Sequence, residues 1–281
     1  MTLKNIGASV RTRIHNKAKA DQVNTQFLLT RYALERLLYR LAVSEHRDNF
    51  LLKGALLFDL WYDVPLRPTR DIDLLGFGIA EIPHLMSVFE DLCAIEVEDG
   101  INFDRATIKA EEIRKDANYS GTRVILVGSI GGAKCSVQVD VGYGDAVTPA
   151  PEMSTYPVML EGMPAPVLRV YPQYTVIAEK FEAIISLGMA NSRMKDYFDL
   201  WVLLRNAELD QAVLEKAVQA TLKRRGTVVP AGIPIGLSDQ FAADRSRKAL
   251  WDAFVARNKL SAASLERTVS DLRDRFAFVL D

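Results

Sequence analysis

Arg-Pro-Thr-Arg-Asp-Ile-Asp-Leu-Leu, residues 67–75, places two carboxylates one residue apart in an otherwise apolar run that predicts a β-strand. Side chains alternate between the two faces of a strand, so Asp71 and Asp73 point the same way while Ile72 and Leu74 face the core. Two carboxylates on one face repel each other unless a cation lies between them. Mg²⁺ prefers one or two carboxylates completed by substrate phosphates, so the pair is typical of a metal-dependent phosphoryl or nucleotidyl transfer site. An isolated Asp-x-Asp also occurs at solvated strand edges and turns.

An apolar run upstream, residues 50–62, is interrupted once, at Lys53-Gly54. The pattern predicts a short buried strand, a tight turn and then a helix whose first turn offers backbone N–H groups to a phosphate. The alternative is a strand-to-helix turn that needs Gly54 only for its backbone angles.

Residues 134–143 alternate cleanly downstream and predict a second strand. Cys135 and the valines fall on one face, and Asp140 falls on the other with Ser136 and Gln138. If this strand pairs beside the first, Asp140 joins Asp71 and Asp73, and three acids can hold two metal ions about 3.5–4 Å apart. Asp140 can equally belong to the polar face of a half-exposed strand.

Residues 175–185 have a helical period in which Lys180 interrupts an apolar stripe. Burying a cation is costly, so either the stem carries the ammonium to the surface or the ammonium meets a carboxylate or phosphate. A second amphipathic helix follows over residues 191–204. Its Asp196 and Asp199 lie near the N-terminus of the helix, where acids commonly serve as simple partners of the helix dipole.

These motifs together resemble the AbiEii/AbiGii-type nucleotidyltransferase toxins, whose relatives include the MenT toxins. The resemblance covers roughly residues 45–205, and several spaced motifs in one order are more specific than any single one. In chain order, the motifs are Lys53-Gly54-Ala55, Arg67 with Thr69-Arg70-Asp71-Ile72-Asp73, Asp140, Glu179-Lys180-Phe181-Glu182-Ala183-Ile184 and Arg193-Met194-Lys195-Asp196.

The resemblance implies an α+β fold, with a polymerase-β-like nucleotidyltransferase core built on a mixed sheet and followed by a mainly helical C-terminal part. It also implies Mg²⁺ dependence and a nucleoside triphosphate (NTP) donor, and the three acids described above would form the two-metal site. Asp71 and Asp73 would be metal ligands with Asp140 as the third, Lys180 would contact donor phosphates, and Asp196 would be a further essential acid. We assign nucleotide binding to Lys53, Gly54, Arg70, Lys180 and Arg193.

One departure concerns the turn before the Asp-x-Asp strand. The wider superfamily usually has Gly-Ser there, whereas this chain has Gly54-Ala55 and a longer spacer. Without a hydroxyl, the turn can offer only backbone donors to a phosphate.

The function expected from this resemblance is transfer of a nucleotide from an NTP onto an RNA acceptor such as tRNA. The chain would act as the toxin of a toxin–antitoxin or phage-defence pair, with a cognate antitoxin as partner. Two alternatives remain open: transfer to a protein or small molecule, and a non-catalytic nucleotide-binding module on the same fold.

The chain has 281 residues and a net charge of −1, so no overall field attracts nucleic acid and any RNA contact must be local. The basic patches that could make such contacts are Lys4, Arg11, Arg13, Lys17 and Lys19, then Lys223-Arg224-Arg225, and then Arg245, Arg247 and Lys248. Each patch can also be ordinary solvated helix surface.

Cys93 and Cys135 belong to no close-spaced metal or redox motif, and no apolar segment is long enough for a signal peptide or membrane span. We therefore expect a cytoplasmic protein with reduced thiols and no membrane partner. The predicted domains are residues 1–147, with N-terminal helices and the α/β core, and 148–281, with a Pro-rich crossover and a helical C-terminal domain.

The remaining predicted elements are a helix over residues 21–47, a helix near 82–93 and strands near 122–130 and 135–141. The long helix has five expected core positions: Leu28, Tyr32, Leu34, Leu38 and Leu41.

Overall fold

The computed structural model describes residues 5–62, 68–116 and 119–280. Two of the residues quoted above, Lys4 and Arg67, lie outside this described part. The chain divides into two compact units. Unit 1 comprises Met1–Gly144 with Glu152–Val170, and unit 2 comprises Asp145–Pro151 with Tyr171–Asp281.

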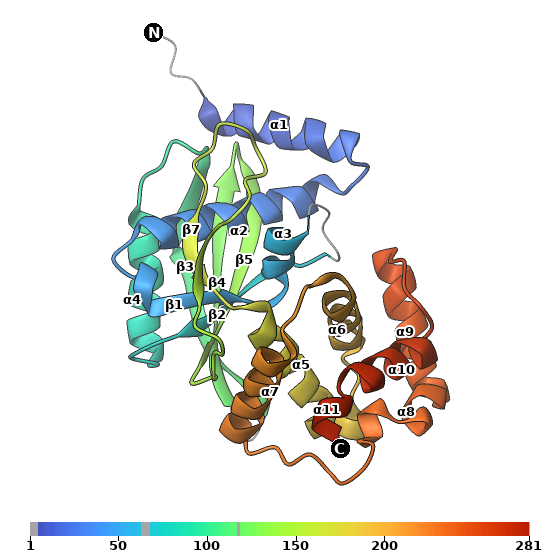
Figure 1. The fold of residues 1–281 in the computed structure, drawn as a ribbon. Helices are drawn as coiled ribbons and strands as arrows, with labels where there is room; N and C mark the ends of the chain where they lie inside the picture. Colours follow the sequence, from blue (N-terminus) through green and yellow to red (C-terminus); the bar gives the residue numbers. More distant parts are fainter. Residues whose placement is uncertain (1–4, 63–67, 117–118, 281) are drawn as a thin grey trace. The chain divides into compact units, whose positions relative to one another are not determined.

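Unit 1 is built on a mixed seven-stranded sheet of order β3-β4-β5-β2-β1-β7-β6 (Figure 1). The pairs β2–β5 and β1–β7 are parallel, and the other neighbours are antiparallel. The strands are β1 (Phe50–Lys53), β2 (Asp71–Gly76), β3 (Ile101–Asp116), β4 (Tyr119–Ile130), β5 (Ala133–Tyr143), β6 (Glu152–Thr155) and β7 (Val167–Val170).

The helices of unit 1 supply the apolar cover of this sheet. Helix α2 contacts β5, α4 contacts β3, and the two helices contact each other. The helices are α1 (Ile6–Ala20), α2 (Thr25–Val43), α3 (Phe58–Trp61) and α4 (Ile82–Ala94), with 3-10 turns at Arg47–Asn49 and Gly54–Leu57. The side chain of Asn24 caps α2 by accepting a hydrogen bond from the Phe27 backbone N–H. All five core positions predicted for α2 are buried, so this prediction is confirmed.

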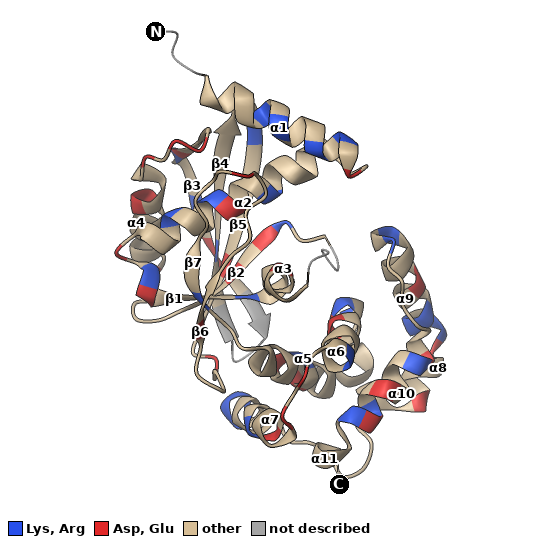
Figure 2. Cartoon of the chain, turned by 45° about the horizontal axis from the view of Figure 1, so that its top comes forward, with Lys and Arg blue, Asp and Glu red and all other residues tan. Residues whose placement is uncertain are grey.

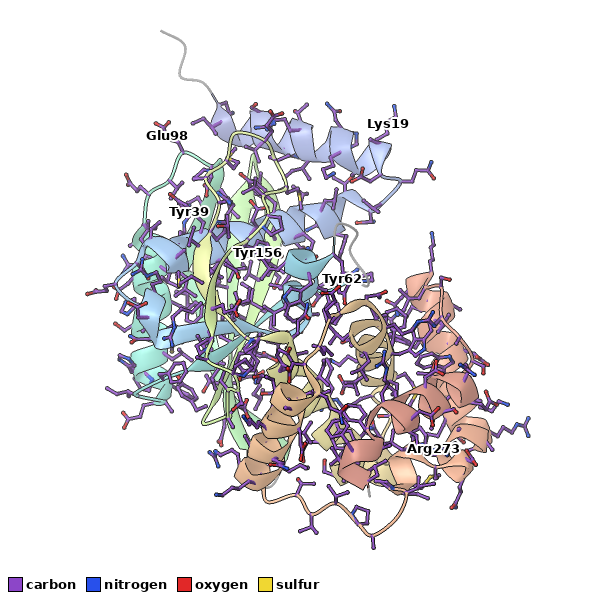
Figure 3. The ribbon with its side chains drawn as sticks, in the orientation of Figure 1. Lys19, Tyr39, Tyr62, Glu98, Tyr156 and Arg273 are labelled. Carbon is purple, nitrogen blue, oxygen red and sulfur yellow. The ribbon has the colours of Figure 1, made fainter. Side chains whose placement is uncertain are left out.

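The segment after β6 is anchored to α2 and α3. Glu35 accepts a hydrogen bond from the Met159 backbone N–H at 2.6 Å, and Arg36 donates to the Pro164 carbonyl at 2.9 Å. Tyr156, which is labelled in Figure 3, follows β6 in the chain. Its hydroxyl donates a hydrogen bond to Asp59 of α3. Residues 152–170, which the sequence interpretation assigned to the second domain, therefore group with unit 1. The predicted domain boundary stays a prediction.

Unit 2 is helical. Ring pairs at its core include Phe181 on Phe276, with centroids 4.1 Å apart, and Tyr197 on Phe241 at 5.1 Å. The helices are α5 (Gln173–Leu187), α6 (Met194–Asn206), α7 (Gln211–Arg225), α8 (Asp239–Ala243), α9 (Arg245–Asn258), α10 (Leu265–Arg275) and α11 (Ala277–Leu280), with 3-10 turns at Gly188–Ala190 and Ile235–Leu237. A mixed sheet followed by a mainly helical part confirms the predicted α+β fold class.

Candidate active site

The site begins with a row of charged residues across four neighbouring strands. The strand registers place Lys53 opposite Asp73, Asp73 opposite Asp140, and Asp140 opposite Arg123. Residues directly opposite each other in a ladder point to the same face of the sheet. Lys53, Asp73, Asp140 and Arg123 therefore form one row, which we call the charged row, and β2 lies beside β5 as the sequence analysis required for Asp140 to join Asp73.

Asp71 lies two residues before Asp73 on β2 and therefore on the same face of the sheet. It lies opposite Gln138 of β5, and both Asp71 and Asp73 are half-buried, while Ile72 between them is buried in the core. The hydroxyl of buried Thr69 donates a hydrogen bond to Asp71 Oδ1 at 2.6 Å and so fixes the carboxylate. In the sequence, Thr69 stands out only as part of the motif. A hydroxyl two residues before an acid nevertheless predicts a local hydrogen bond to that acid.

Gly54 is explained by its contact with Asp73. Its φ is +74°, and a Cβ at this position would lie 2.1 Å from Asp73 Oδ2. The sequence predicted a helix after this turn, but the structure has a 3-10 turn followed by the four-residue α3. The glycine is therefore required by its backbone angle and by the close approach of Asp73. Since these two requirements already explain Gly54, its presence is not evidence that the turn binds phosphate.

Arg123 is a member of the site that the sequence analysis missed. Its Nε and Nη2 donate to Asp140 Oδ1 and Oδ2, each at 2.9 Å, in a two-point ion pair. These hydrogen bonds, with the attraction of Asp140, Glu111 and Asp71, raise the pKa of the guanidinium despite partial burial. The sequence signal was Arg123 itself, a single cation directly before the apolar residues Val124–Val127. A charge within a largely apolar strand is costly unless it has an anionic partner.

Lys180 and its partners form a second cluster, within unit 2. The ammonium lies 2.8 Å from Asp196 Oδ1 and 2.8 Å from Asp199 Oδ2, and both aspartates are fully buried. Arg193 Nε lies 2.7 Å from Asp196 Oδ2. Of the two alternatives for Lys180, the structure has the second, because its ammonium meets two carboxylates in the interior. Asp196 and Asp199 likewise do more than face a helix dipole.

The predicted site residues thus fall into two sets. Unit 1 holds Asp71, Asp73 and Asp140 on one face of the sheet with Lys53 and Gly54 beside them, and Arg70 is exposed directly before β2. Unit 2 holds Lys180, Asp196 and Arg193 in contact with one another.

A family model described as "Nucleotidyl transferase AbiEii toxin, Type IV TA system" matches residues 36–278. The chain belongs to this family. The AbiEii resemblance predicted from the motifs is confirmed, and the match covers both units. The chain is accordingly a nucleotidyl transferase of the AbiEii toxin type. A search of curated proteins gave no match.

Three solved structures align with most of this AbiEii family member at low sequence identity. JHP933 from Helicobacter pylori is 18% identical, with 92% of this chain and 93% of that chain covered and a TM-score of 0.48. An H. pylori protein described as a candidate nucleotidyltransferase is 19% identical, with 92% and 96% covered and a TM-score of 0.49. An antigenic nucleotidyltransferase-like protein from Paracoccidioides brasiliensis is 10% identical, with 85% and 93% covered and a TM-score of 0.32. Because these scores are low, the family assignment rests on the family match.

The carboxylates of the charged row are chemically suited to a divalent cation. Mg²⁺ takes oxygen ligands, and Asp71, Asp73 and Asp140 present carboxylates on one face from adjacent strands. The Asp73 carboxylate packs directly against the Gly54 backbone, in the space that a larger residue at position 54 would take. These three aspartates could hold a metal ion if their carboxylates turned toward a shared position.

Other clusters lie apart from the charged row. Glu45, His46 and Asp91 bring potential ligand atoms within 4.8 Å of one another, with His46 Nε2 at 3.0 Å from Asp91 Oδ2, but both acids are exposed. Cys93 and Cys135 are free and buried, and burial raises the pKa of each thiol to about 11, which makes them poor nucleophiles at neutral pH.

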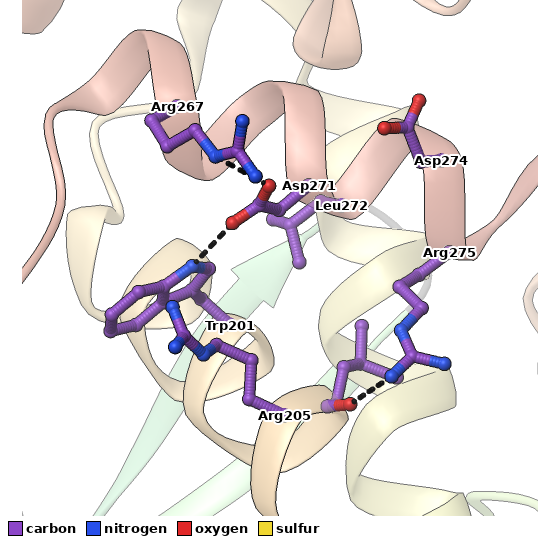
Figure 4. Close-up of a pocket in the computed structure, with 8 residues that line it drawn as sticks. Trp201, Arg205, Arg267, Asp271, Leu272, Asp274 and Arg275 are labelled. Carbon is purple, nitrogen blue, oxygen red and sulfur yellow. Dashed lines mark hydrogen bonds and ion pairs between the residues drawn. The ribbon is translucent and has the colours of Figure 1, made fainter.

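A pocket of about 290 Å³ opens in unit 2 between α6 and α10 (Figure 4). Its polar groups are largely satisfied by one another. Trp201 donates to Asp271 at 3.0 Å, Arg267 pairs with the same carboxylate at 2.8 Å, and Arg205 stacks on the Trp201 ring. The hydrogen bond from Trp201 to Asp271 joins α6 to α10, and the other two contacts lie within α10 and α6 respectively. No described helix is long and apolar enough to cross a membrane.

Proposed function

We propose that this AbiEii family member transfers a nucleotide from an NTP onto an RNA acceptor, with tRNA as the first candidate, in a Mg²⁺-dependent reaction. The observation that carries the proposal is the pairing of Asp73 with Asp140 on adjacent parallel strands, with Asp71 on the same face. Three carboxylates gathered on one face repel one another, which favours the binding of a divalent cation that could in turn hold the phosphates of an NTP.

Asp71, Asp73 and Asp140 would hold the metal ions, whose bound charge would polarise the α-phosphate and lower the pKa of the acceptor hydroxyl. The protein's own contribution is positioning. Thr69 fixes the orientation of Asp71, and the absence of a side chain at Gly54 admits Asp73.

Further nucleotide contacts are assigned by family resemblance. Lys53, nearly buried at the end of the charged row, and exposed Arg70 would bind donor phosphates. Lys180 and Arg193 keep their proposed roles in nucleotide binding, and Asp196 keeps its role as an essential acid. Because Lys180 is held by Asp196 and Asp199, its orientation would be set by these carboxylates before any nucleotide arrives.

We propose that basic residues of α1 and of the end of α7 contact the RNA acceptor, and that Arg225 does not. Arg11 and Arg13 donate to backbone carbonyls, so their charge is not neutralised by these contacts. Arg225 instead pairs with Glu182 at 2.7 Å and with Asp145 at 3.2 Å. Together with Glu179 these acids raise the pKa of Arg225 against the effect of its burial, so this guanidinium is part of the fold of unit 2.

The biological role we propose is that of the toxin of a toxin–antitoxin or phage-defence pair, similar to the MenT toxins, acting in the cytoplasm and opposed by a cognate antitoxin. The family description supports the toxin role and an antitoxin partner.

The test is transfer of label from each of the four α-³²P-labelled NTPs into total RNA and, separately, total protein. We expect RNA to be labelled in the presence of Mg²⁺. Asp71→Asn and Asp73→Asn should each reduce labelling by about a hundredfold or more, because either change removes a metal ligand. Asp48→Asn is the matched control, since Asp48 is an exposed carboxylate away from the charged row.

Two results would change this proposal. Label confined to protein would replace the RNA acceptor with a protein and leave nucleotidyl transfer in place. Undiminished labelling by Asp71→Asn and Asp73→Asn, or no transfer to any fraction, would rule out the charged row as the catalytic centre.

A further inference from the structure

Asp140 has both of its carboxylate oxygens taken by one cation. Arg123 Nε donates to Oδ1 and Nη2 to Oδ2, each at 2.9 Å. The Asp140 side chain is 6% exposed, so the guanidinium covers a carboxylate that has little access to solvent. Such a two-point pair is the strongest form of ion pair between these groups.

The charges along the row explain why this pair forms. Extending the charged row to β3 gives Glu111, Arg123, Asp140, Asp73 and Lys53, each opposite the next in the sheet. The two adjacent acids, Asp140 and Asp73, are therefore bordered by a cation on each side. Because neighbouring carboxylates repel each other, removing either bordering cation would leave excess negative charge on this face.

We infer that Arg123 is the internal counter-cation of this face and competes with a divalent cation for Asp140. A metal ion needs an oxygen of Asp140 directed at it, and the two-point pair with Arg123 holds both oxygens. A metal ion on either oxygen would also lie close to the positive charge of the guanidinium, so Asp140 becomes a better metal ligand when Arg123 gives up at least one of these hydrogen bonds. This inference rests on the proposed function in one respect, since it takes the charged row as a cation site.

The surroundings of Arg123 provide a second position for its side chain. The guanidinium is 32% exposed, so it is not locked into the interior. Exposed Glu111 lies opposite Arg123 on the other neighbouring strand, and its attraction helps to raise the pKa of Arg123. Arg123 can therefore exchange Asp140 for Glu111 without losing an anionic partner. Gln138 lies beside the pair, and its side-chain oxygen accepts hydrogen bonds from Arg123 Nε and Nη2, each at 3.2 Å.

The experiment measures Mn²⁺ binding to the full chain by electron paramagnetic resonance of the free ion, with no nucleotide present. We expect Arg123→Gln to bind Mn²⁺ about tenfold more tightly than the unchanged chain, because the competing ion pair is gone. Asp140→Asn should bind more weakly. In the double variant Arg123→Gln/Asp140→Asn, the gain should vanish, since both changes act through one carboxylate.

Arg105→Gln is the matched control. Arg105 is an exposed arginine of the neighbouring strand β3, 3.9 Å from Glu90, and its removal should leave Mn²⁺ affinity unchanged. Thermal unfolding gives a second readout. Arg123→Gln should melt lower than the unchanged chain without metal, because Asp140 then lacks its partner, and should show the larger rise in melting temperature when Mn²⁺ is added. If Arg123→Gln does not fold without metal, Arg123→Lys should fold and show a smaller gain in affinity.

The outcomes separate this inference from the proposed function. Mn²⁺ binding that depends on Asp71 but is equal or weaker in Arg123→Gln would overturn the competition and leave the cation site in place. The absence of Mn²⁺ binding in every variant would overturn both.

Discussion

Lys180 is the residue whose surroundings change its expected behaviour most. In the sequence it is a cation that interrupts an apolar stripe, and its removal would be expected to relieve the fold. In the structure it is 13% exposed and pairs with two fully buried carboxylates, of which Asp196 also pairs with Arg193. Removing one partner of a buried ion pair leaves the other charge desolvated and uncompensated, which costs far more than the pair itself gains.

We therefore predict that Lys180→Met destabilises unit 2 by about 3–5 kcal/mol, because Asp196 and Asp199 lose their shared partner. Chemical denaturation of the full chain measures this loss. Lys17→Met is the matched control, since it makes the same substitution in an ion pair with Asp21 in which both side chains are 42% exposed. Exposed pairs of this kind contribute little to stability. Equal unfolding free energies for Lys180→Met and the unchanged chain would contradict the prediction.

The same contrast shows what single residues reveal in the sequence. Alternation along β2 was enough to place Asp71 and Asp73 on one face, because the period of a strand is local information. The partners of Lys180 and Asp140 are not local. Asp196 is 16 positions from Lys180, and Arg123 is 17 positions from Asp140, so only the packing of helices and the register of strands bring them together.

Among the elements, the turn between β1 and α3 has two requirements that meet at Gly54. Its φ of +74° disfavours any residue with a side chain, and Asp73 occupies the space that a Cβ would take. Gly132, in the turn between β4 and β5, has a φ of +82°, but no atom lies within 4 Å of the position that a Cβ would take. Substitution of Gly132 therefore tests the cost of the backbone angle alone, whereas substitution of Gly54 adds the cost of the contact with Asp73.

We predict that Gly132→Ala costs about 1–2 kcal/mol, the ordinary penalty of a left-handed backbone. Gly54→Ala should cost more and should also weaken Mn²⁺ binding, because the new methyl group displaces the Asp73 carboxylate. Thermal unfolding and Mn²⁺ titration of both variants check this. If Gly54→Ala matches Gly132→Ala in both measurements, Asp73 has moved aside freely and the contact has no functional role.

The secondary structure was predicted correctly where one hydrophobic period continued along the whole element. Helix α2 and strand β5 have clear periods and were predicted close to their observed bounds. Strand β3 was not predicted, because the ladder shifts register between Asp104 and Lys109. Buried Phe103 and buried Ile108 fall on opposite parities of the sequence, so the alternation that indicates a strand is interrupted within the element.

The whole molecule is close to electrical neutrality, and its charges are interspersed over both units (Figure 2). Much of that charge is internal to the fold. Arg40 pairs with fully buried Asp99 at 2.7 Å, and Arg225 pairs with Glu182. A count of basic residues therefore overstates the charge available to a polyanion, and the sequence could not separate structural arginines from exposed ones because the partners of Arg225 come from distant segments.

For this reason, we predict different effects from two groups of basic residues on RNA binding. The triple change Arg11→Gln, Arg13→Gln and Lys19→Gln on α1 should weaken RNA binding broadly. For every phosphate that the variant no longer neutralises, the dependence of log affinity on log salt concentration should flatten by about 0.7–0.9. Nucleotide binding should be unchanged. Arg225→Gln should instead lower stability, because it leaves Glu182 buried without its partner. Filter binding across a salt series and thermal unfolding measure both effects. An unchanged salt slope in the triple variant would show that α1 does not contact the acceptor and would favour a protein or small-molecule acceptor.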